Sequence, residues 1–322
     1  MKSIGGYFGL ELSRGSSFHR DLISLNSGRN CLELVLRNSE FDHVLVPLYS
    51  CNFILEPIIK LGIKFSFFSI NERFEPIIDF SKYNSRTAII LINYFGLYEE
   101  FIRRFVNNCP LNVIVDNTQA FFSKPLSGVT TLYSPRKFFG VPDGGYLHFP
   151  FRDVLTDQLE KASSLDRVSH LIGRIDKDAE TYYSEFVLND SSLSGLPIQK
   201  MSNLTSTILN SIDYDFVVKT RIVNFNFLWS ALSDKNLFTL PRLTNSAVPM
   251  VFPFWTGNVN LRYKLREKRV YCPVFWPCVL DLASEKSFEK RVCDEFVFLP
   301  IDQRYNITDM DFIVTEIMKE LN

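Results

Sequence analysis

The sequence has no excess of charge of either sign and little that could bind a metal ion. Its 35 lysine and arginine residues nearly balance 36 aspartate and glutamate residues, which argues against a nucleic acid or an anionic membrane as the main partner. The four histidines are scattered and no CxxC pair is present, so no metal site is predicted. A small molecule is therefore the expected ligand.

Long apolar runs are also missing. Runs such as AIILINYFGL are far shorter than the roughly 20 residues that a transmembrane helix needs. The N-terminal stretch MKSIGGYFGLELSRG has one lysine and no sustained apolar segment, which argues against a signal peptide. The six cysteines are expected to be free thiols, as is usual in a reducing compartment. The protein is therefore predicted to be soluble and cytoplasmic.

What the chain does have is length and apolar content. Hydrophobic residues make up 46% of its 322 residues, and 30 phenylalanines contrast with 5 methionines, so a globular fold with an unusually aromatic core is predicted. A chain of this size can form a large domain and a smaller one. We expect a large domain over residues 1–235 and a small C-terminal α/β domain over residues 236–322.

Helix and strand patterns alternate in the first half of the chain. The expected strands, most of them apolar on both faces, cover residues 42–46, 63–69, 87–93, 111–115, 129–133 and 145–149. The expected helices between them cover residues 28–37, 52–61 and 99–107. Strands that are buried on both faces and separated by helices indicate a mostly parallel, doubly wound α/β sheet.

The second half of the chain changes character. Residues 151–232 are expected to form two long, polar helical segments, which a Gly/Ser/Pro interruption at residues 191–197 separates. The C-terminal part then follows the order strand, helix, strand, helix, strand, helix, and its last helix covers residues 309–321. This order predicts the smaller α/β domain.

Three loops that follow strands or open helices are candidates for a ligand site, because ligands of doubly wound sheets bind beyond the carboxyl ends of the strands. Residues 26–30 form a small turn before a helix, which suits a phosphate or is only a helix cap. Asp116 ends an apolar strand, where it could cap a helix or hold a cationic ring. Lys137 lies in an aromatic, glycine-rich loop, where partial desolvation would make its amine a usable nucleophile and base.

Together these loops resemble the sugar aminotransferase family called DegT/DnrJ/EryC1/StrS, whose members use pyridoxal 5'-phosphate (PLP). The matching segments occur in the family's order: NSGRNCLEL, VPLYSCNFILEPIIKLG, INYFG, VDNTQAF, YSPRKFFGVPDGG and FVFLPID. The resemblance implies a PLP-dependent transferase fold of the aspartate-aminotransferase type. It also favours an aminotransferase over the family's dehydratases, because the dehydratases replace the lysine that Lys137 matches.

The resemblance assigns roles around the cofactor ring. Lys137 would form the Schiff base with PLP and then act as the base that moves a proton between carbon atoms. Asp116 would pair with the pyridine nitrogen, and Gln119 would lie near the ring hydroxyl.

The resemblance also places the cofactor phosphate. Backbone N–H groups of Gly28, Arg29 and Asn30 would hold it at the helix start. The Ser134 hydroxyl would add a further contact.

Two positions depart from the family pattern. Cys51 stands where the family commonly has an aromatic residue stacked on the cofactor ring, so Tyr49 or Phe53 would have to compensate. Asn93 stands where a histidine is common, and we count it among the candidate substrate residues.

Three further residues have a functional and an ordinary interpretation. Tyr7 could lie over the mouth of the site or simply pack as part of the terminus. Arg304 could bind a substrate carboxylate or phosphate, or form a surface ion pair. Trp276 could stack on a ligand, but its apolar neighbours in sequence favour burial in the core or an interface.

The leading functional hypothesis is a PLP-dependent aminotransferase. It would transfer an amino group from an amino acid, with glutamate as the expected donor, to a keto group of a nucleotide-linked sugar in polysaccharide biosynthesis. The resemblance implies a homodimer with sites at the subunit boundary. Two alternatives stay open: another PLP-dependent reaction, such as a lyase or an amino-acid transaminase, and a non-catalytic sensor that binds the cofactor or a nucleotide sugar.

Overall fold

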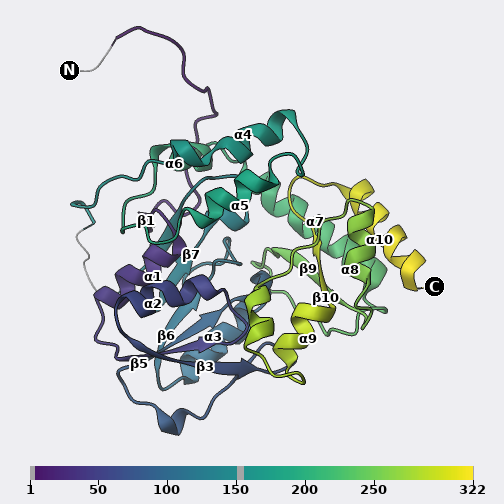
Figure 1. Cartoon of the computed structure of the whole chain (residues 1–322), viewed down its shortest axis with the longest axis horizontal. Helices are drawn as coiled ribbons and strands as arrows, with labels where there is room; N and C mark the ends of the chain where they lie inside the picture. Colours follow the sequence, from purple (N-terminus) through teal and green to yellow (C-terminus); the bar gives the residue numbers. More distant parts are fainter. Residues whose placement is uncertain (1–3, 151–155, 322) are drawn as a thin grey trace.

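The largest feature of the computed structural model, which describes residues 4–150 and 156–321, is an eight-stranded sheet (Figure 1). Its strands are β1 (Ile23–Leu25), β2 (His43–Pro47), β3 (Lys64–Ile70), β4 (Pro76–Ile77), β5 (Thr87–Ile92), β6 (Asn112–Asp116), β7 (Thr130–Tyr133) and β8 (Gly145–His148). Their order across the sheet is β1-β8-β7-β6-β5-β2-β3-β4. Strands β3, β2, β5, β6 and β7 run parallel, whereas β8, β1 and β4 pair antiparallel with their neighbours. The predicted mostly parallel sheet is confirmed.

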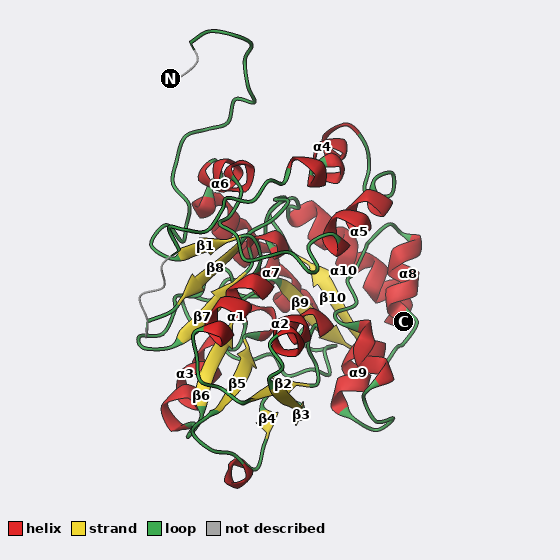
Figure 2. Cartoon of the chain, turned by 60° about the vertical axis from the view of Figure 1, so that its left-hand side comes forward, coloured by secondary structure: helices red, strands yellow, loops and turns green. Residues whose placement is uncertain are grey.

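Helices cover both faces of this sheet, as the apolar strands predict. On one face lie α1 (Gly28–Arg37) and α2 (Leu55–Lys60), and on the other lies α3 (Glu99–Asn108) (Figure 2). Neighbouring strand residues point to opposite faces. Ile90 therefore packs with the apolar side chains of α1 and α2, whereas Leu91 packs with Ile102 of α3.

The position of α1 follows from its first residues. Ser27 has extended backbone geometry, and its hydroxyl accepts a hydrogen bond from the Asn30 N–H at 3.1 Å, which is the geometry of an N-cap. The predicted start and end of this helix are both confirmed. Gly145 on β8 is required beside this cap, because a Cβ there would lie 2.5 Å from the Ser27 backbone.

Two short strands at the edges of the sheet are missing from the sequence prediction. β1 has three residues and β4 has two, too few for an alternating pattern to stand out. The other six strands of the large sheet agree with their predicted bounds to within one residue.

Helices connect the large sheet to the C-terminal part of the chain. Residues 151–155 lie outside the described residues, and the rest of the polar region forms four helices where two were expected. These are α4 (Ser169–Asp176), α5 (Tyr183–Ser191), α6 (Asn203–Asn210) and α7 (Tyr214–Leu232). The long helix α7 packs on the C-terminal elements, against α10 and β9.

A second, two-stranded sheet follows, formed by β9 (Val251–Trp255) and β10 (Phe296–Pro300) in antiparallel pairing. Its helices are α8 (Leu261–Glu267), α9 (Phe288–Glu295) and α10 (Ile307–Leu321). The prediction of a third strand here is wrong for the described residues, because the segment 271–276 has no regular secondary structure. Pro273 and Pro277 explain this difference, since each lacks the N–H that a strand ladder needs. The division at residue 235 stays a prediction.

Short 3-10 turns complete the fold. They are η1 (Asn52–Ile54), η2 (Phe80–Lys82), η3 (Tyr94–Gly96), η4 (Pro135–Lys137), η5 (Leu165–Arg167) and η6 (Pro277–Asp281). Over the described residues, no helix combines the length and the apolar character needed to cross a lipid bilayer.

The N-terminal segment extends away from the rest of the chain (Figure 1). Its apolar side chains are almost fully exposed, at 99% for Ile4, 98% for Tyr7 and 92% for Phe8. Tyr7 therefore does not lie over the candidate site of its own chain, and the terminal packing that was the alternative is not seen either.

Candidate functional site

Three predicted loops meet at the carboxyl edge of the large sheet. A Cβ placed on Gly28, in the turn before α1, would lie 3.5 Å from Thr118 Cγ2 and 4.0 Å from Ser134 Cβ. Thr118 follows β6, and Ser134 follows β7. A single added methyl group would thus touch both neighbours, so the turn 26–30, the loop after β6 and the lysine loop after β7 lie close together.

Thr118 links the two residues that carry most of the predicted chemistry. The Thr118 N–H donates to Asp116 Oδ1 at 2.8 Å, and Lys137 Nζ donates to Thr118 Oγ1, also at 2.8 Å. Asp116 and Lys137 were predicted from the sequence, whereas Thr118 was not. Its position between Asp116 and Gln119 in the segment VDNTQAF was the available signal.

Asp116 is a buried carboxylate without a cationic partner. Its residue is 8% exposed, and in the described part of the chain no lysine, arginine or histidine nitrogen lies within 4.0 Å of its oxygens. The Thr118 N–H is its one hydrogen-bond donor there. Burying an unpaired charge is costly, so this carboxylate suits a ligand that brings a positive group.

Gln119 is a second buried group with unused hydrogen-bonding capacity. It is fully buried, and its Oε1 accepts the Phe95 N–H at 3.0 Å. Its Nε2 has no partner among the described residues. A buried amide donor left unpaired costs about 1–3 kcal/mol, so a ligand with an acceptor at this atom would recover that energy.

Lys137 is more accessible than the sequence predicts. The expectation that its aromatic loop desolvates it is wrong for the single chain, because the Lys137 side chain is exposed. The reason lies in the turn η4, after which Phe138 and Phe139 point into the core and are 4% and 6% exposed. The lysine is thereby left on the open side, held by Thr118.

The turn 26–30 agrees in part with the phosphate role. The Asn30 N–H is taken by the Ser27 hydroxyl, and the Asn30 side chain donates to the Leu196 carbonyl at 3.0 Å. Asn30 thus makes structural hydrogen bonds here, and its backbone N–H, predicted to bind a phosphate, already has a partner. Phosphate binding by the Gly28 and Arg29 N–H groups stays a prediction. The same holds for the Ser134 hydroxyl, which lies beside Gly28.

The Arg29 side chain is already paired. Arg29 Nη1 donates to Glu56 Oε2 at 2.8 Å, and the guanidinium lies 4.3 Å from the ring centre of Phe53. Glu56 also accepts the Gly195 N–H and the Ser194 hydroxyl. Burial by itself would raise the pKa of Glu56, but the hydrogen bonds from Gly195 and Ser194 and the charge of Arg29 lower it.

A second wall of the site comes from the C-terminal part of the chain. Cys278 Sγ lies 4.0 Å from the Ser50 carbonyl oxygen, in the turn after β2. The Trp276 ring centre lies 6.0 Å from Lys137 Nζ. The sequence favoured core or interface burial of Trp276 over ligand stacking, and it gave no sign that this residue lies beside the lysine.

Cys51 lies beside these groups. Burial raises the pKa of its thiol, and the nearby charge of Lys137 lowers it. The two residues predicted to substitute for the missing aromatic residue pack against other parts of the protein. Tyr49 is fully buried in the aromatic core, and Phe53 lies against the Arg29 guanidinium.

The two remaining candidate substrate residues are occupied by protein contacts. Asn93 is 1% exposed, and its amide bonds to the Tyr98 N–H at 3.0 Å and to Asn117 Oδ1 at 3.2 Å. Arg304 forms two hydrogen bonds with the Asp302 carboxylate, at 2.7 and 2.8 Å. The substrate role predicted for each residue is therefore not supported, and the ion-pair alternative for Arg304 is confirmed.

The neighbour of Arg304 has a clearer connection to the site. Gln303 Nε2 donates to the Phe138 carbonyl at 2.7 Å, and Gln303 Oε1 accepts from the buried Arg221 at 3.1 Å. The Arg221 guanidinium also lies 4.6 Å from the ring centre of Phe138. Residues of α7 and of the segment after β10 thus hold the lysine loop from behind, which the sequence gave no sign of.

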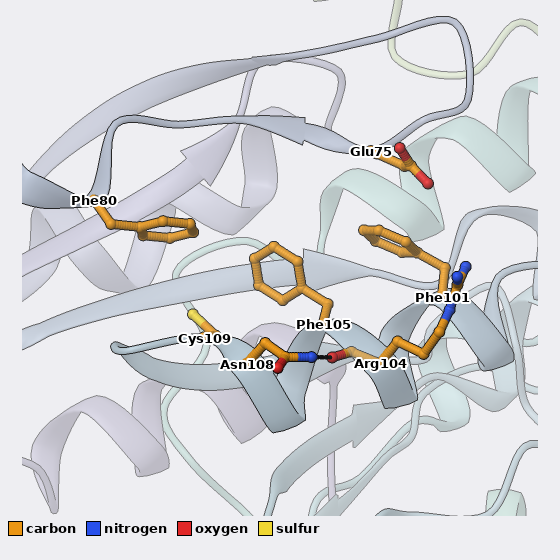
Figure 3. Close-up of a pocket in the computed structure, with 7 residues that line it drawn as sticks. All are labelled: Glu75, Phe80, Phe101, Arg104, Phe105, Asn108 and Cys109. Carbon is orange, nitrogen blue, oxygen red and sulfur yellow. Dashed lines mark hydrogen bonds between the residues drawn. The ribbon is translucent and has the colours of Figure 1, made fainter.

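A hollow in the described structure lies away from these residues. It has a volume of about 280 Å³ and is lined by Glu75, Phe80, Phe101, Arg104, Phe105, Asn108 and Cys109 (Figure 3). Phenylalanine rings from α3 and η2 form most of its wall. Since it contains none of the predicted chemical groups and no buried unpaired polar atom among the described residues, we place the candidate site at Lys137 on chemistry rather than on volume.

Comparisons with known proteins agree with this fold. No protein-family model matches the chain, and no curated protein is significantly similar to it. Three solved structures illustrate the matches that do exist. The sugar aminotransferase CalS13 from Micromonospora echinospora is 17% identical, with 92% of this chain and 87% of CalS13 covered and a TM-score of 0.65. A DegT/DnrJ/EryC1/StrS aminotransferase from Brucella abortus is 15% identical, with 92% and 85% covered and a TM-score of 0.62.

NtdA from Bacillus subtilis, solved with the bound cofactor PMP, is 18% identical, with 92% of this chain and 72% of NtdA covered and a TM-score of 0.66. Identities this low carry information on the fold alone, and at that level the predicted resemblance is confirmed. The chain has the fold of the DegT/DnrJ/EryC1/StrS sugar aminotransferases.

Proposed function

We propose that this protein is a PLP-dependent aminotransferase. The single observation that carries the proposal is the pairing of Asp116 with Lys137 through Thr118 at the carboxyl edge of the sheet. Among the described residues, no cation pairs with the buried Asp116 carboxylate and no acceptor pairs with the Gln119 amide nitrogen. A ligand with a protonated ring nitrogen, a ring oxygen and an aldehyde would satisfy all three residues.

The cofactor fits these residues in a defined way. Asp116 would hold the proton on the pyridine nitrogen, and Gln119 Nε2 would donate to the ring hydroxyl. The N–H groups at the start of α1 would hold the phosphate. PLP, when bound, supplies an electron sink for the substrate carbanion.

The protein's own part in the reaction is proton transfer and positioning. Lys137 Nζ would take the proton from the substrate carbon that bears the amine and would deliver it to a second carbon, so it would act first as a base and then as an acid. The Thr118 hydroxyl orients the Lys137 amine, because it accepts a hydrogen bond from Nζ. The exposure of Lys137 lets a substrate reach it from the open side.

A half-reaction tests the proposal. Protein loaded with PLP is mixed with glutamate alone, and released keto acid is measured with the change in cofactor absorbance. We expect about one equivalent of keto acid per chain for the wild type and none for Lys137→Ala. A protein that binds PLP but releases no keto acid from any amino acid would be the sensor instead.

The finer parts of the proposal rest on the structures of similar fold. CalS13 is a sugar aminotransferase, so we propose a nucleotide-linked keto sugar as acceptor, in polysaccharide biosynthesis. Activity with a panel of such sugars, set against keto acids, tests this choice. We also propose a cytoplasmic location, supported by the six free cysteines.

We propose a homodimer as the working form. The support is the extended N-terminal segment, whose Ile4, Tyr7 and Phe8 side chains are almost fully exposed in the single chain. Exposed apolar groups of this density are typical of a segment that packs on a partner. Light scattering of the full chain and of a variant that lacks residues 1–12 tests the proposal, which expects a dimer that weakens on truncation.

A further inference from the structure

The site next to Lys137 has an aromatic side chain, but the C-terminal part of the chain supplies it. Trp276 lies just before η6, with its ring centre 6.0 Å from Lys137 Nζ. Its indole meets the ring of Tyr49 edge to face, at a centroid distance of 4.7 Å. The residue is half-buried, so part of its surface is open to a ligand.

The backbone of Trp276 shows that this position is held by its surroundings. Its φ of 56° and ψ of 60° lie in the left-handed region, which is a genuine outlier for a bulky residue. Such conformations persist where the surrounding structure enforces them, and they cluster at functional sites. Here the Val279 N–H donates to the Trp276 carbonyl at 2.9 Å, and Cys278 contacts the Ser50 carbonyl.

Other aromatic side chains near this position have different partners. Tyr49 is enclosed by Phe74, Tyr94 and Trp276, and it is fully buried. Phe53 has its face against the Arg29 guanidinium. Cys51 offers only a thiol toward Lys137. Among these residues Trp276 alone combines an aromatic ring, partial exposure and closeness to the Lys137 amine.

We propose that Trp276 provides the aromatic surface for the pyridine ring of PLP, so that the C-terminal segment, and not the turn after β2, packs against the cofactor. This inference rests on the proposed function, because it concerns the same cofactor. A planar aromatic ligand attached beside Lys137 Nζ would contact the indole, and aromatic pairs of this kind add to affinity beyond the area that they bury. Trp276 acts in binding, and no proton transfer is assigned to it.

The test is the dissociation constant for PLP, measured from cofactor absorbance at equilibrium without substrate. We expect Trp276→Ala and Trp276→Leu to weaken PLP binding by about 2- to 13-fold, whereas Trp276→Phe stays close to the wild type. Trp276→Leu keeps apolar bulk, which guards against an effect of misfolding. Trp229→Leu on α7 is the matched control, because this half-exposed tryptophan packs on Phe225, outside the set of site residues.

A double variant sharpens the test. Adding Cys51→Phe to Trp276→Leu should recover most of the lost PLP affinity, because it restores an aromatic ring beside Lys137 from the other wall. If the wild type binds PLP and Trp276→Leu binds it equally well, this inference is overturned while the proposed function stands. If the wild type does not bind PLP at all, the proposed function fails and this inference fails with it.

Discussion

The two walls of the candidate site differ in how the fold produces them. The sheet wall is defined as Gly28, Asp116, Thr118 and Lys137. These residues are the first of α1, the last of β6, and two in the loops after β6 and β7. The C-terminal wall, defined as Trp276, Cys278 and Gln303, comes from segments outside strands and α-helices. The sheet wall provides the groups for chemistry, and the C-terminal wall provides packing and support. Removing groups from the first should therefore cost activity, and removing groups from the second should cost affinity and stability.

The largest effect is expected on the sheet wall at Lys137. Lys137→Ala should lower transamination by at least about 10⁴-fold, the upper range for the loss of a general base. The fold should survive, because the side chain is exposed. Steady-state rates and circular dichroism check both points. The exposed Lys124, which is not part of either wall, supplies the control Lys124→Ala, and equal losses in the two variants would contradict the assignment.

Asp116 is expected to show the next largest effect. Asp116→Asn keeps the shape of the side chain but removes the charge, so the rate should fall by about 10²–10³-fold, as on loss of a strong electrostatic contact. PLP should still bind to the variant. Single-turnover kinetics with glutamate measure this loss, and Asp234→Asn on the surface is the control. A wild-type rate in Asp116→Asn would make Asp116 a turn residue only.

In the core behind the sheet wall, the buried His19 should make the stability of the fold depend on pH. His19 is buried, and its Nε2 lies 2.6 Å from the Phe121 carbonyl. Burial lowers its pKa from 6.5 to about 4, against the effect of that hydrogen bond. Below pH 6.5 the unfolded chain binds a proton that the folded chain does not, so stability falls as the pH falls toward 4.

The loss from His19 should reach about 2 kcal/mol at pH 5 relative to pH 7. Urea unfolding at both pH values measures it. His19→Gln cannot titrate, so its stability should depend less on pH by that amount. Burial also lowers the pKa values of His148 and His170, and both remain in the variant. The same pH dependence in both proteins would show that His19 is protonated in the fold.

The smallest effect is expected where the C-terminal wall supports the lysine loop. Gln303→Ala removes the hydrogen bonds to the Phe138 carbonyl and to Arg221. The free energy of unfolding should fall by about 1 kcal/mol, with a modest rise in the KM for substrate. Gln158→Ala, at an exposed position, is the comparison. A rate loss as large as that of Asp116→Asn would place Gln303 in the chemistry.

The difference between the walls also explains what the sequence could predict. Asp116 and Lys137 belong to or follow continuous apolar strands, and parallel strands bring their carboxyl ends to one edge of the sheet. Local patterns were therefore sufficient to predict that these two residues lie close together. Trp276 and Gln303 lie beyond residue 270 and reach the site only through packing of the C-terminal part on the large sheet. No local pattern encodes that contact.

Two of the candidate site residues make hydrogen bonds within the protein that the sequence does not reveal. Asn30 and Asn93 have suitable chemistry and positions, but both use their hydrogen-bonding groups inside the protein. Such pairing depends on groups far along the chain, as with Asn30 and the Leu196 carbonyl. The exposure of Lys137 was misjudged for a similar reason, because the inward turn of Phe138 and Phe139 is a feature of packing.

The most direct test of the central claim is to identify the residue that binds PLP. The purified protein is incubated with PLP, reduced with borohydride, digested and analysed by mass spectrometry. The account predicts one reduced pyridoxyl phosphate on the peptide that contains Lys137 and none in Lys137→Ala. An unmodified protein, or label distributed over exposed lysines such as Lys124 with Lys137 left free, would contradict it.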